Sequence, residues 1–286
     1  GMGSFNIHGN DLLEDIPQFN KLERVTGFSM RISFNPYLKS VEGFQSLEFI
    51  NNLLIIESNG WQNDEMPISD FPELKEIQGF LILRIGITTI NGFNKLEEVI
   101  GITIESTRVT EIVGFNSLRE LFYVEIEDHV FDLVLIDAFK NLEHIRDRFR
   151  LWNNRVLADI EGFQKLTTVG GDFNLDNHFA LPNLNFLRNL TSVGQAHSVT
   201  RLTLSWNQLL SDCNGIALLA QFGELPDIID IDNNAGNCND LATIIANADR
   251  DQDGVLDSVD VDDDNDGIND NLEADGDFDL DNDLIP

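Results

Sequence analysis

The sequence predicts a mainly β fold: short coils of chain stacked into a solenoid with a parallel sheet, followed by a short α-helical cap and a loop-rich tail. Three observations predict it. A short apolar motif recurs eight times, stretches of alternating apolar and polar residues follow the motif, and aspartates recur at fixed spacing near the C-terminus. The first two observations define the coils, and the third defines the tail.

The repeated motif is [IV]-x-x-F-x-x-L-x-x-[IV]. Its first residue recurs after 25, 27, 22, 22, 24, 24 and 24 residues, and the eighth copy has Leu in place of Phe. One copy cannot bury its apolar side chains alone, so we expect the copies to stack and to build one core over residues 16–210. The copies are Ile16/Phe19/Leu22/Val25, Val41/Phe44/Leu47/Ile50, Ile68/Phe71/Leu74/Ile77, Ile90/Phe93/Leu96/Val99, Ile112/Phe115/Leu118/Leu121, Ile136/Phe139/Leu142/Ile145, Ile160/Phe163/Leu166/Val169 and Leu184/Leu187/Leu190/Val193.

Alternating stretches follow the motif, and such alternation is typical of a β-strand with one buried face. We therefore expect one strand per coil. The stretches include FSMRISFN (28–35), ITIES (102–106), VEIED (124–128), FRLWNN (149–154), FNLDNH (173–178) and LTLSWN (202–207). Asparagines end several strands, and their side chains are expected to bond backbone groups at the bend: Asn35, Asn59, Asn153, Asn177 and Asn207.

Residues 211–248 break the repeat. NGIALLAQF (214–222) has helical spacing, DIIDIDNN (227–234) predicts a last strand, and NDLATIIANA (239–248) predicts a helix that begins at an Asn or Asp cap. A capping unit is expected here, because the last coil would otherwise expose its core. Residues 1–15 are expected to be an N-terminal lead-in, in which we interpret Gly1 before Met2 as a remnant of tag removal.

The repeats resemble the receptor L domain, a leucine-rich-repeat-like family of right-handed β-helices in receptor ectodomains and microbial surface proteins. The resemblance rests on the words I-x-G-F-x-x-L-x-x-[IV], clearest at residues 90–99 and 160–169, and it covers residues 16–210. It implies a right-handed β-helix in an extracellular protein, and it specifies architecture more than ligand. The 22-residue coils and the insertion WQNDEMP (61–67) depart from the regular pattern.

The acidic tail follows a thirteen-residue register, D-x-D-x-D-G-x-x-D-x-x-[DE]. Ca²⁺ takes six to eight oxygens, which such loops supply from positions 1, 3, 5, 7, 9 and 12, and glycine at position 6 makes the turn. We expect two Ca²⁺ loops; the alternative is a solvated acidic tail. The expected ligands are Asp249, Asp251, Asp253, the carbonyl of Val255, Asp257 and Asp260, then Asp262, Asp264, Asp266, the carbonyl of Ile268, Asp270 and Glu273. The side chains of Val255 and Ile268 are expected to pack inward.

A third, weaker copy contains Asp275, Asp277, Asp279 and Asp283, with Leu280 where glycine is expected. Only Val261 separates the first two loops, so the arrangement resembles thrombospondin type 3 repeats, over residues 249–283, more than a helix–loop–helix EF-hand. That resemblance implies calcium binding in an extracellular, often adhesive, protein. We expect residues 249–286 to form a calcium-binding tail that is truncated at its C-terminal end.

The charge and the cysteine content limit which partners and which cellular compartment are expected. The net charge is -32, from 50 acids and 18 bases, which disfavours nucleic acid as a partner. No apolar run reaches the length of about 18 residues that a membrane span needs, so we expect no direct membrane insertion. Cys213 and Cys238 are expected to form a disulfide in an oxidising compartment, with two buried free thiols as the alternative. We expect a monomer that is secreted or associated with the cell surface or outer membrane.

Catalytic motifs are absent from the sequence. No G-x-S-x-G, G-x-x-x-x-G-K-[ST] or G-x-G-x-x-G occurs, and the five histidines show no metal-ligand spacing, so we interpret each as a surface or loop residue. The outward positions of the sheet form the expected ligand-binding face: Glu105, Glu125, Glu127, Arg150, Trp152 and Asp176. Trp206 is expected to pack against the protein.

Three functions compete. The first is a non-catalytic recognition or adhesion module of a bacterial surface protein, which binds a glycan or an extracellular protein through the solenoid face and uses the Ca²⁺ loops as a rigid spacer. The second is a polysaccharide-active β-helix enzyme, because neighbouring strands would bring carboxylates about 5 Å apart. The third is a purely structural spacer. Turnover of a glycan would favour the second, and absence of binding by a rigid, elongated molecule would favour the third.

Overall fold

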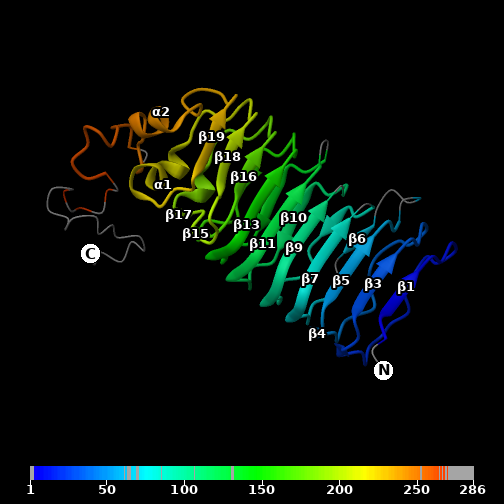
Figure 1. Cartoon of the computed structure of the whole chain (residues 1–286). Helices are drawn as coiled ribbons and strands as arrows, with labels where there is room; N and C mark the ends of the chain where they lie inside the picture. The colour runs from blue at the N-terminus through cyan, green and yellow to red at the C-terminus, as the bar shows by residue number, and fades with distance from the viewer. Residues whose placement is uncertain are drawn as a thin grey trace.

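The computed structural model describes residues 3–60, 62, 66–68, 71–84, 86–105, 107–129, 132–251, 253–263, 265, 267 and 269. These residues form an elongated parallel β-solenoid with β1 (Phe5–His8) at one end (Figure 1). The short helices α1 (Ala217–Phe222) and α2 (Leu241–Ala246) lie at the other end. The predicted mainly β solenoid with a short helical element is confirmed.

One face of the solenoid is a 14-stranded sheet in the described part of the chain, and all its pairings there are parallel. It begins at β1, inside the predicted lead-in, so the ladder starts before residue 16. The main path runs from β1 through β3 (Ser29–Ser33), β5 (Leu53–Glu57), β7 (Glu76–Arg84), β9 (Glu98–Glu105), β11 (Glu120–Glu127), β13 (His144–Trp152), β16 (Phe173–Asp176) and β18 (Arg201–Ser205) to β19 (Ile228–Asp232). Apolar side chains alternate inward along these strands.

A second, five-stranded sheet is found among the described residues, and the prediction of one strand per coil is wrong in this respect. The first residues of the motif, such as Ile90, are themselves extended and pair with their counterparts in neighbouring coils. The second sheet contains β6 (Pro67–Ile68), β8 (Thr89–Ile90), β10 (Glu111–Gly114), β12 (Leu135–Ala138) and β14 (Asp159–Ile160). Short strands also extend the first sheet around its corner: β2 (Arg24–Val25), β4 (Phe49–Ile50), β15 (Thr168–Val169) and β17 (Ser192–Val193).

The phenylalanines of the motif stack along the solenoid axis. From Phe19 to Phe163, neighbouring rings lie nearly parallel with centroids 5.0–5.5 Å apart. From Phe44 onward these rings are fully buried, and the motif leucines and isoleucines surround them in one continuous core. Offset stacking at this separation adds to the gain from burying apolar area, so the ladder joins each coil to the next.

A second internal ladder is polar and lies where the long strands end. Asn35, Asn59, Asn154, His178 and Asn207 are all fully buried. The Oδ1 of Asn207, for example, accepts the backbone N–H of His178 at 2.9 Å. The prediction for Asn35, Asn59 and Asn207 thus agrees with the bonds seen, whereas that for Asn153 and Asn177 is off by one residue.

The one-residue error has a backbone cause. Asn153 and Asn177 have φ of 56° and 61°, the left-handed region that asparagine tolerates better than most residues. They make the bend, and the following residue points into the core. His129 and His178 lie in loops, as expected, but they occupy ladder positions and are fully buried, so neither is a surface residue.

The cap contains the helical segment, the last strand and the second helix that were predicted for it. A 3₁₀ turn, η2 (Asn214–Ile216), precedes α1, and β19 extends the sheet by one strand. Asp240 caps α2 by accepting the N–H of Thr243 at 2.7 Å. Another 3₁₀ turn, η1 (Asn185–Leu187), replaces the bend in the eighth motif copy, where Leu stands in place of Phe. Cys213 and Cys238 form the predicted disulfide.

No helix in the described part of the chain combines the length and apolar character needed to cross a bilayer.

Candidate functional site

The residues predicted to face a ligand lie together on the outer surface of the first sheet. In-register pairing puts Glu105 beside Glu127 and Trp152 beside Asp176, while Glu127 and Trp152 are themselves partners. Glu125 is paired with Arg150 two residues earlier on the same strands. The six predicted residues therefore form two short rows across β9, β11, β13 and β16, and we call them the Trp152 face.

The carboxylates of the Trp152 face are held by arginines. Glu105 pairs with Arg84 at 2.7 Å, Glu125 with Arg148 at 2.8 Å, and Glu127 with Arg150 at 3.1 Å. The Arg150 guanidinium also lies 5.1 Å from the centroid of the Trp152 ring, within cation–π range. The face therefore presents a lattice of fixed, alternating charges beside one aromatic ring.

Asp176 lies on the outer side of the sheet by its register, but it is not accessible to a ligand as predicted. Its side chain is buried, and one carboxylate oxygen accepts the backbone N–H and the hydroxyl of Ser205, both at 2.9 Å. These two bonds fix the neighbouring strand β18. Glu127 differs from the other glutamates of the face, because burial raises the pKa of its carboxyl. Arg150 opposes this shift, and the nearby Glu125 and Glu105 carboxylates add to it.

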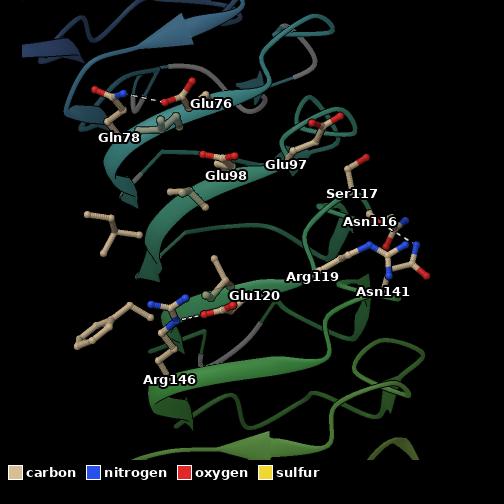
Figure 2. A pocket seen from close by; sticks show the side chains of 15 residues that line it. Glu76, Gln78, Glu97, Glu98, Asn116, Ser117, Arg119, Glu120, Asn141 and Arg146 are labelled. Atoms are coloured by element: carbon tan, nitrogen blue, oxygen red, sulfur yellow. Dashed lines mark hydrogen bonds and ion pairs between the residues drawn. The ribbon is translucent and has the colours of Figure 1, made fainter.

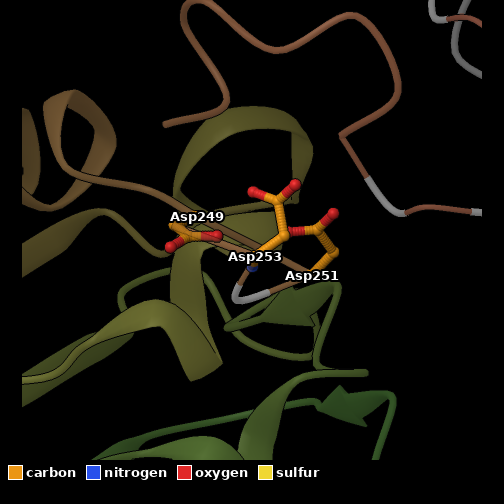
Figure 3. Close-up of side chains that lie close together, drawn as sticks. All are labelled: Asp249, Asp251 and Asp253. Carbon is orange, nitrogen blue, oxygen red and sulfur yellow. Dashed lines mark hydrogen bonds between the residues drawn. The ribbon is translucent and has the colours of Figure 1, made fainter. Parts of the chain in front are cut away.

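The first acidic loop brings three predicted metal ligands together. One carboxylate oxygen each from Asp249, Asp251 and Asp253 lies within 4.8 Å of the others, as Figure 3 shows. Two oxygens that bind one Ca²⁺ at about 2.4 Å lie at most about 4.8 Å apart, so this spacing fits a shared cation. Gly254 has φ of 94°, and its N–H donates to Asp249 at 3.2 Å, which closes the turn beneath the three carboxylates.

The second loop repeats this contact thirteen residues later. Gly267 has φ of 91°, and its N–H donates to Asp262 at 3.1 Å. In both loops the other oxygen of the first aspartate, Oδ1 of Asp249 and of Asp262, is buried and accepts no hydrogen bond from the residues that the structure describes. A buried anionic oxygen without a donor is costly, and a cation would satisfy it. The chemistry of the donors therefore fits Ca²⁺.

The other carboxylates of the first loop, Asp257 and Asp260, accept hydrogen bonds from the protein, and their predicted role as metal ligands stays a prediction. The Asp257 carboxylate accepts bonds from the Arg250 backbone at 2.9 Å and from Gln221 of α1 at 3.2 Å. Asp260 accepts the N–H groups of Val261 and Asp262. The prediction that the Val255 side chain packs inward is wrong, because it is 40% exposed.

Much of the acidic tail lies outside the described residues. This applies to the predicted ligands Asp264, Asp266, Ile268, Asp270 and Glu273, and to Asp275, Asp277, Asp279 and Asp283 of the weaker third copy.

The first loop is anchored to the cap. Arg250 pairs with Asp257 and, at 3.0 Å, with Asp263 of the second loop, and it lies 5.7 Å from the ring centroid of Phe222 in α1. The backbone N–H of Asp249 donates to Asn214 at 3.1 Å. Arg250 is the single base among the sixteen acids of residues 249–286, and this was the sequence signal for a link between the loops.

Two surface features differ from expectation or were missed. Trp206 packs against the protein only in part, because 52% of it is exposed. A groove of about 1240 Å³ lies at the corner where β7, β9, β11 and β13 bend, and most of its lining residues had not been singled out from the sequence. The 22-residue spacing was only a partial signal, because β9 lies in a 22-residue coil and β11 lies in a 24-residue coil.

No protein-family model, no curated protein and no solved structure matches this chain.

Proposed function

We propose that this chain is a non-catalytic recognition module of a bacterial protein that is secreted or surface-attached, with a tail that binds Ca²⁺. The solenoid is the receptor-L-domain-like part, and it binds a glycan or an extracellular protein through the Trp152 face. The tail is the thrombospondin-type-3-like part, and it acts as a calcium-stiffened spacer. The observation that carries the proposal is the convergence of Asp249, Asp251 and Asp253.

The Trp152 face supports the recognition half of the proposal. It offers an aromatic ring, three arginines and three glutamates in fixed positions on a rigid sheet, so a ligand would meet groups that lose little freedom on binding. Arg84, Arg148 and Arg150 offset the charges of the three glutamates, so with Asp176 the face is only slightly negative despite the net charge of the chain. A neutral glycan or a mixed-charge protein surface therefore suits it better than a highly charged polymer.

Calcium titration calorimetry tests the tail. The wild-type chain should release or absorb heat on adding Ca²⁺, and the paired change Asp251→Asn with Asp253→Asn should abolish the signal from the first loop. Asp11→Asn, an exposed acid at the far end of the solenoid, is the control and should bind as wild type does. If the wild-type chain binds no Ca²⁺ at millimolar Ca²⁺ concentration, the calcium proposal is wrong.

A glycan and extracellular-protein array tests the Trp152 face. Binding should be lost in Trp152→Ala and kept in Trp206→Ala, because both tryptophans are partly exposed and only the first lies on this face. Arrays that stay blank for the wild-type chain would count against recognition and favour the structural spacer.

One observation favours the polysaccharide-active enzyme as a second candidate. Burial raises the pKa of Glu127, and a raised pKa suits a general acid beside a second carboxylate such as Glu125. A reducing-end assay over a panel of polysaccharides checks this candidate. Turnover that disappears in Glu127→Gln would replace the recognition proposal with an enzymatic one.

A further inference from the structure

The groove at the corner of the first sheet originates where two strands turn the corner with one residue fewer than their neighbours. Two residues separate the buried Val99 and Ile102 in β9, and two separate Leu121 and Val124 in β11. In the flanking strands β7 and β13 the corresponding buried residues are separated by three. The pairing registers shift at these points, from Ile77 to Phe80 and from Leu121 to Tyr123. Bulged strands therefore flank a recess two strands wide.

Two of the residues that line the recess are apolar and exposed. Ile100 of β9 and Phe122 of β11 lie at the two shortened corners, and they are 42% and 45% exposed. Neighbouring apolar side chains that stay exposed inside a groove are typical of a surface that a ligand covers.

The surrounding side chains give the groove a negative charge (Figure 2). Both arginines of the groove are committed to acids: Arg146 pairs with Glu120, and Arg119 pairs with Glu143 at 2.6 Å. Glu97 and Glu98 are exposed, and within the described residues no cationic side chain pairs with either. Glu76, the direct strand partner of Glu98, accepts a bond from Gln78 at 2.8 Å.

We propose that this groove is a second binding site, which takes an extended peptide segment of a partner protein that alternates lysine or arginine with apolar residues. The cationic groups would lie against Glu97 and Glu98, and the apolar side chains would cover Ile100 and Phe122. A net charge of -32 steers a basic partner toward the chain in general, and the exposed side chains of Ile100 and Phe122 select this groove within it. Trp152 lies six positions after Arg146 along β13, which is about 20 Å of strand, and the groove shares no residue with the Trp152 face.

Fluorescence anisotropy with the full chain in millimolar calcium tests the proposal. The probe is a fluorescein-labelled octapeptide of alternating lysine and leucine, compared with a lysine–serine octapeptide of the same charge. The wild-type chain should prefer the leucine peptide. Glu97→Gln with Glu98→Gln should weaken its binding about fivefold, a modest factor because exposed ion pairs are individually weak, and Phe122→Ser should abolish the preference for leucine.

The matched control is Glu42→Gln with Glu111→Gln, which removes the same charge from exposed positions outside the groove and should bind as wild type does. Equal affinities of the two double variants would mean that the peptide senses only overall charge, and would overturn the proposal. So would a neutral oligosaccharide whose binding is lost in Phe122→Ser, since the groove would then belong to a glycan. Trp152→Ala should leave peptide binding unchanged, so failure of the recognition proposal and failure of this one can be told apart.

Discussion

Asn59 accepts two hydrogen bonds from Asn35, one coil away. Its Oδ1 lies 3.2 Å from the backbone nitrogen and 2.9 Å from the side-chain nitrogen of Asn35, and its own Nδ2 donates to the carbonyl of Ile32 at 2.7 Å. Both asparagines are fully buried. The side-chain amide thus replaces the backbone pairing that the bend interrupts, and it does so from inside the core.

Asn59→Ala should destabilise the solenoid by about 3 kcal/mol, because it leaves a buried N–H and a buried carbonyl without partners. Urea unfolding followed by circular dichroism measures the change. Asn94→Ala is the control; the Asn94 side chain is exposed and donates to the nearby carbonyl of Asn91, so its loss should cost less than about 0.5 kcal/mol. Equal midpoints for the two variants would contradict a structural role for the ladder.

The buried histidine His178 should make stability fall in mild acid. Both ring nitrogens approach backbone carbonyl oxygens, of Asn154 and Leu151, at 3.1 Å. Burial nevertheless lowers the pKa of His178, and the two carbonyls oppose this only in part. Since the unfolded chain takes up the proton first, stability should be complete above about pH 6.5 and decline as pH falls through the lowered folded value.

His178→Asn tests that origin, because asparagine occupies the same position in neighbouring coils at Asn154 and Asn207. Chemical unfolding at a series of pH values should show a shallower loss of stability below about pH 6.5 in the variant. Adding His129→Asn should flatten the profile further, since burial also lowers the pKa of His129. A profile parallel to that of the wild type in both variants would assign the acid response to other groups.

Phe139 is the central test of the aromatic ladder. Its ring lies 5.0 Å from those of Phe115 and Phe163 and is fully buried. Phe139→Ala should cost about 3–5 kcal/mol, because it removes both ring contacts and leaves a cavity. Phe28→Ala, at a ring that is 68% exposed, should change stability by less than about 0.5 kcal/mol. Thermal unfolding of the two variants makes the comparison.

Chelation of calcium should loosen the tail and leave the solenoid intact. Hydrogen exchange in the presence of a chelator should rise over residues 249–269, while far-ultraviolet circular dichroism stays nearly unchanged. The physical reason is that the coils are joined by their own ladders, whereas the first loop touches the cap mainly through Arg250, Gln221 and Asn214. Cooperative loss of sheet signal on chelation would show instead that the loops support the fold.

The sequence predicts the coils well, because stacking is a local rule. Each phenylalanine of the motif must meet the next, so the spacing alone places Phe115, Phe139 and Phe163 in one ladder. The bends are harder to predict, since Asn153 and Asn154 have the same side chain and differ only in backbone φ. The prediction of surface histidines fails for a similar reason. His178 takes the place of an asparagine as a partner of backbone carbonyls, and the sequence does not show that its side chain points inward.

In the candidate sites too, contacts between residues close in the chain are predictable from the sequence, and contacts that depend on the fold are not. The aspartate register predicts the convergence of Asp249, Asp251 and Asp253, because those ligands are close in the chain. It does not predict that Asp257 turns toward Gln221, since that contact depends on how the loop lies on the cap. The corner groove depends on a length difference between neighbouring coils, which becomes visible only when buried positions such as Val99 and Ile102 are aligned.

The in-register pairing of the strands governs where this protein tolerates changes in length. An extra residue within β11 or β13 would turn every following side chain to the opposite face, exposing Val124 or Phe149 and burying charge. Extra residues at the corner do not have this cost. A seven-residue loop from Gly194 to Thr200 precedes β18, and Val193 and Leu202 on either side of it are still buried in the core. Insertions and deletions should therefore accumulate at the corners, where they remodel the surface while the hydrophobic frame stays fixed.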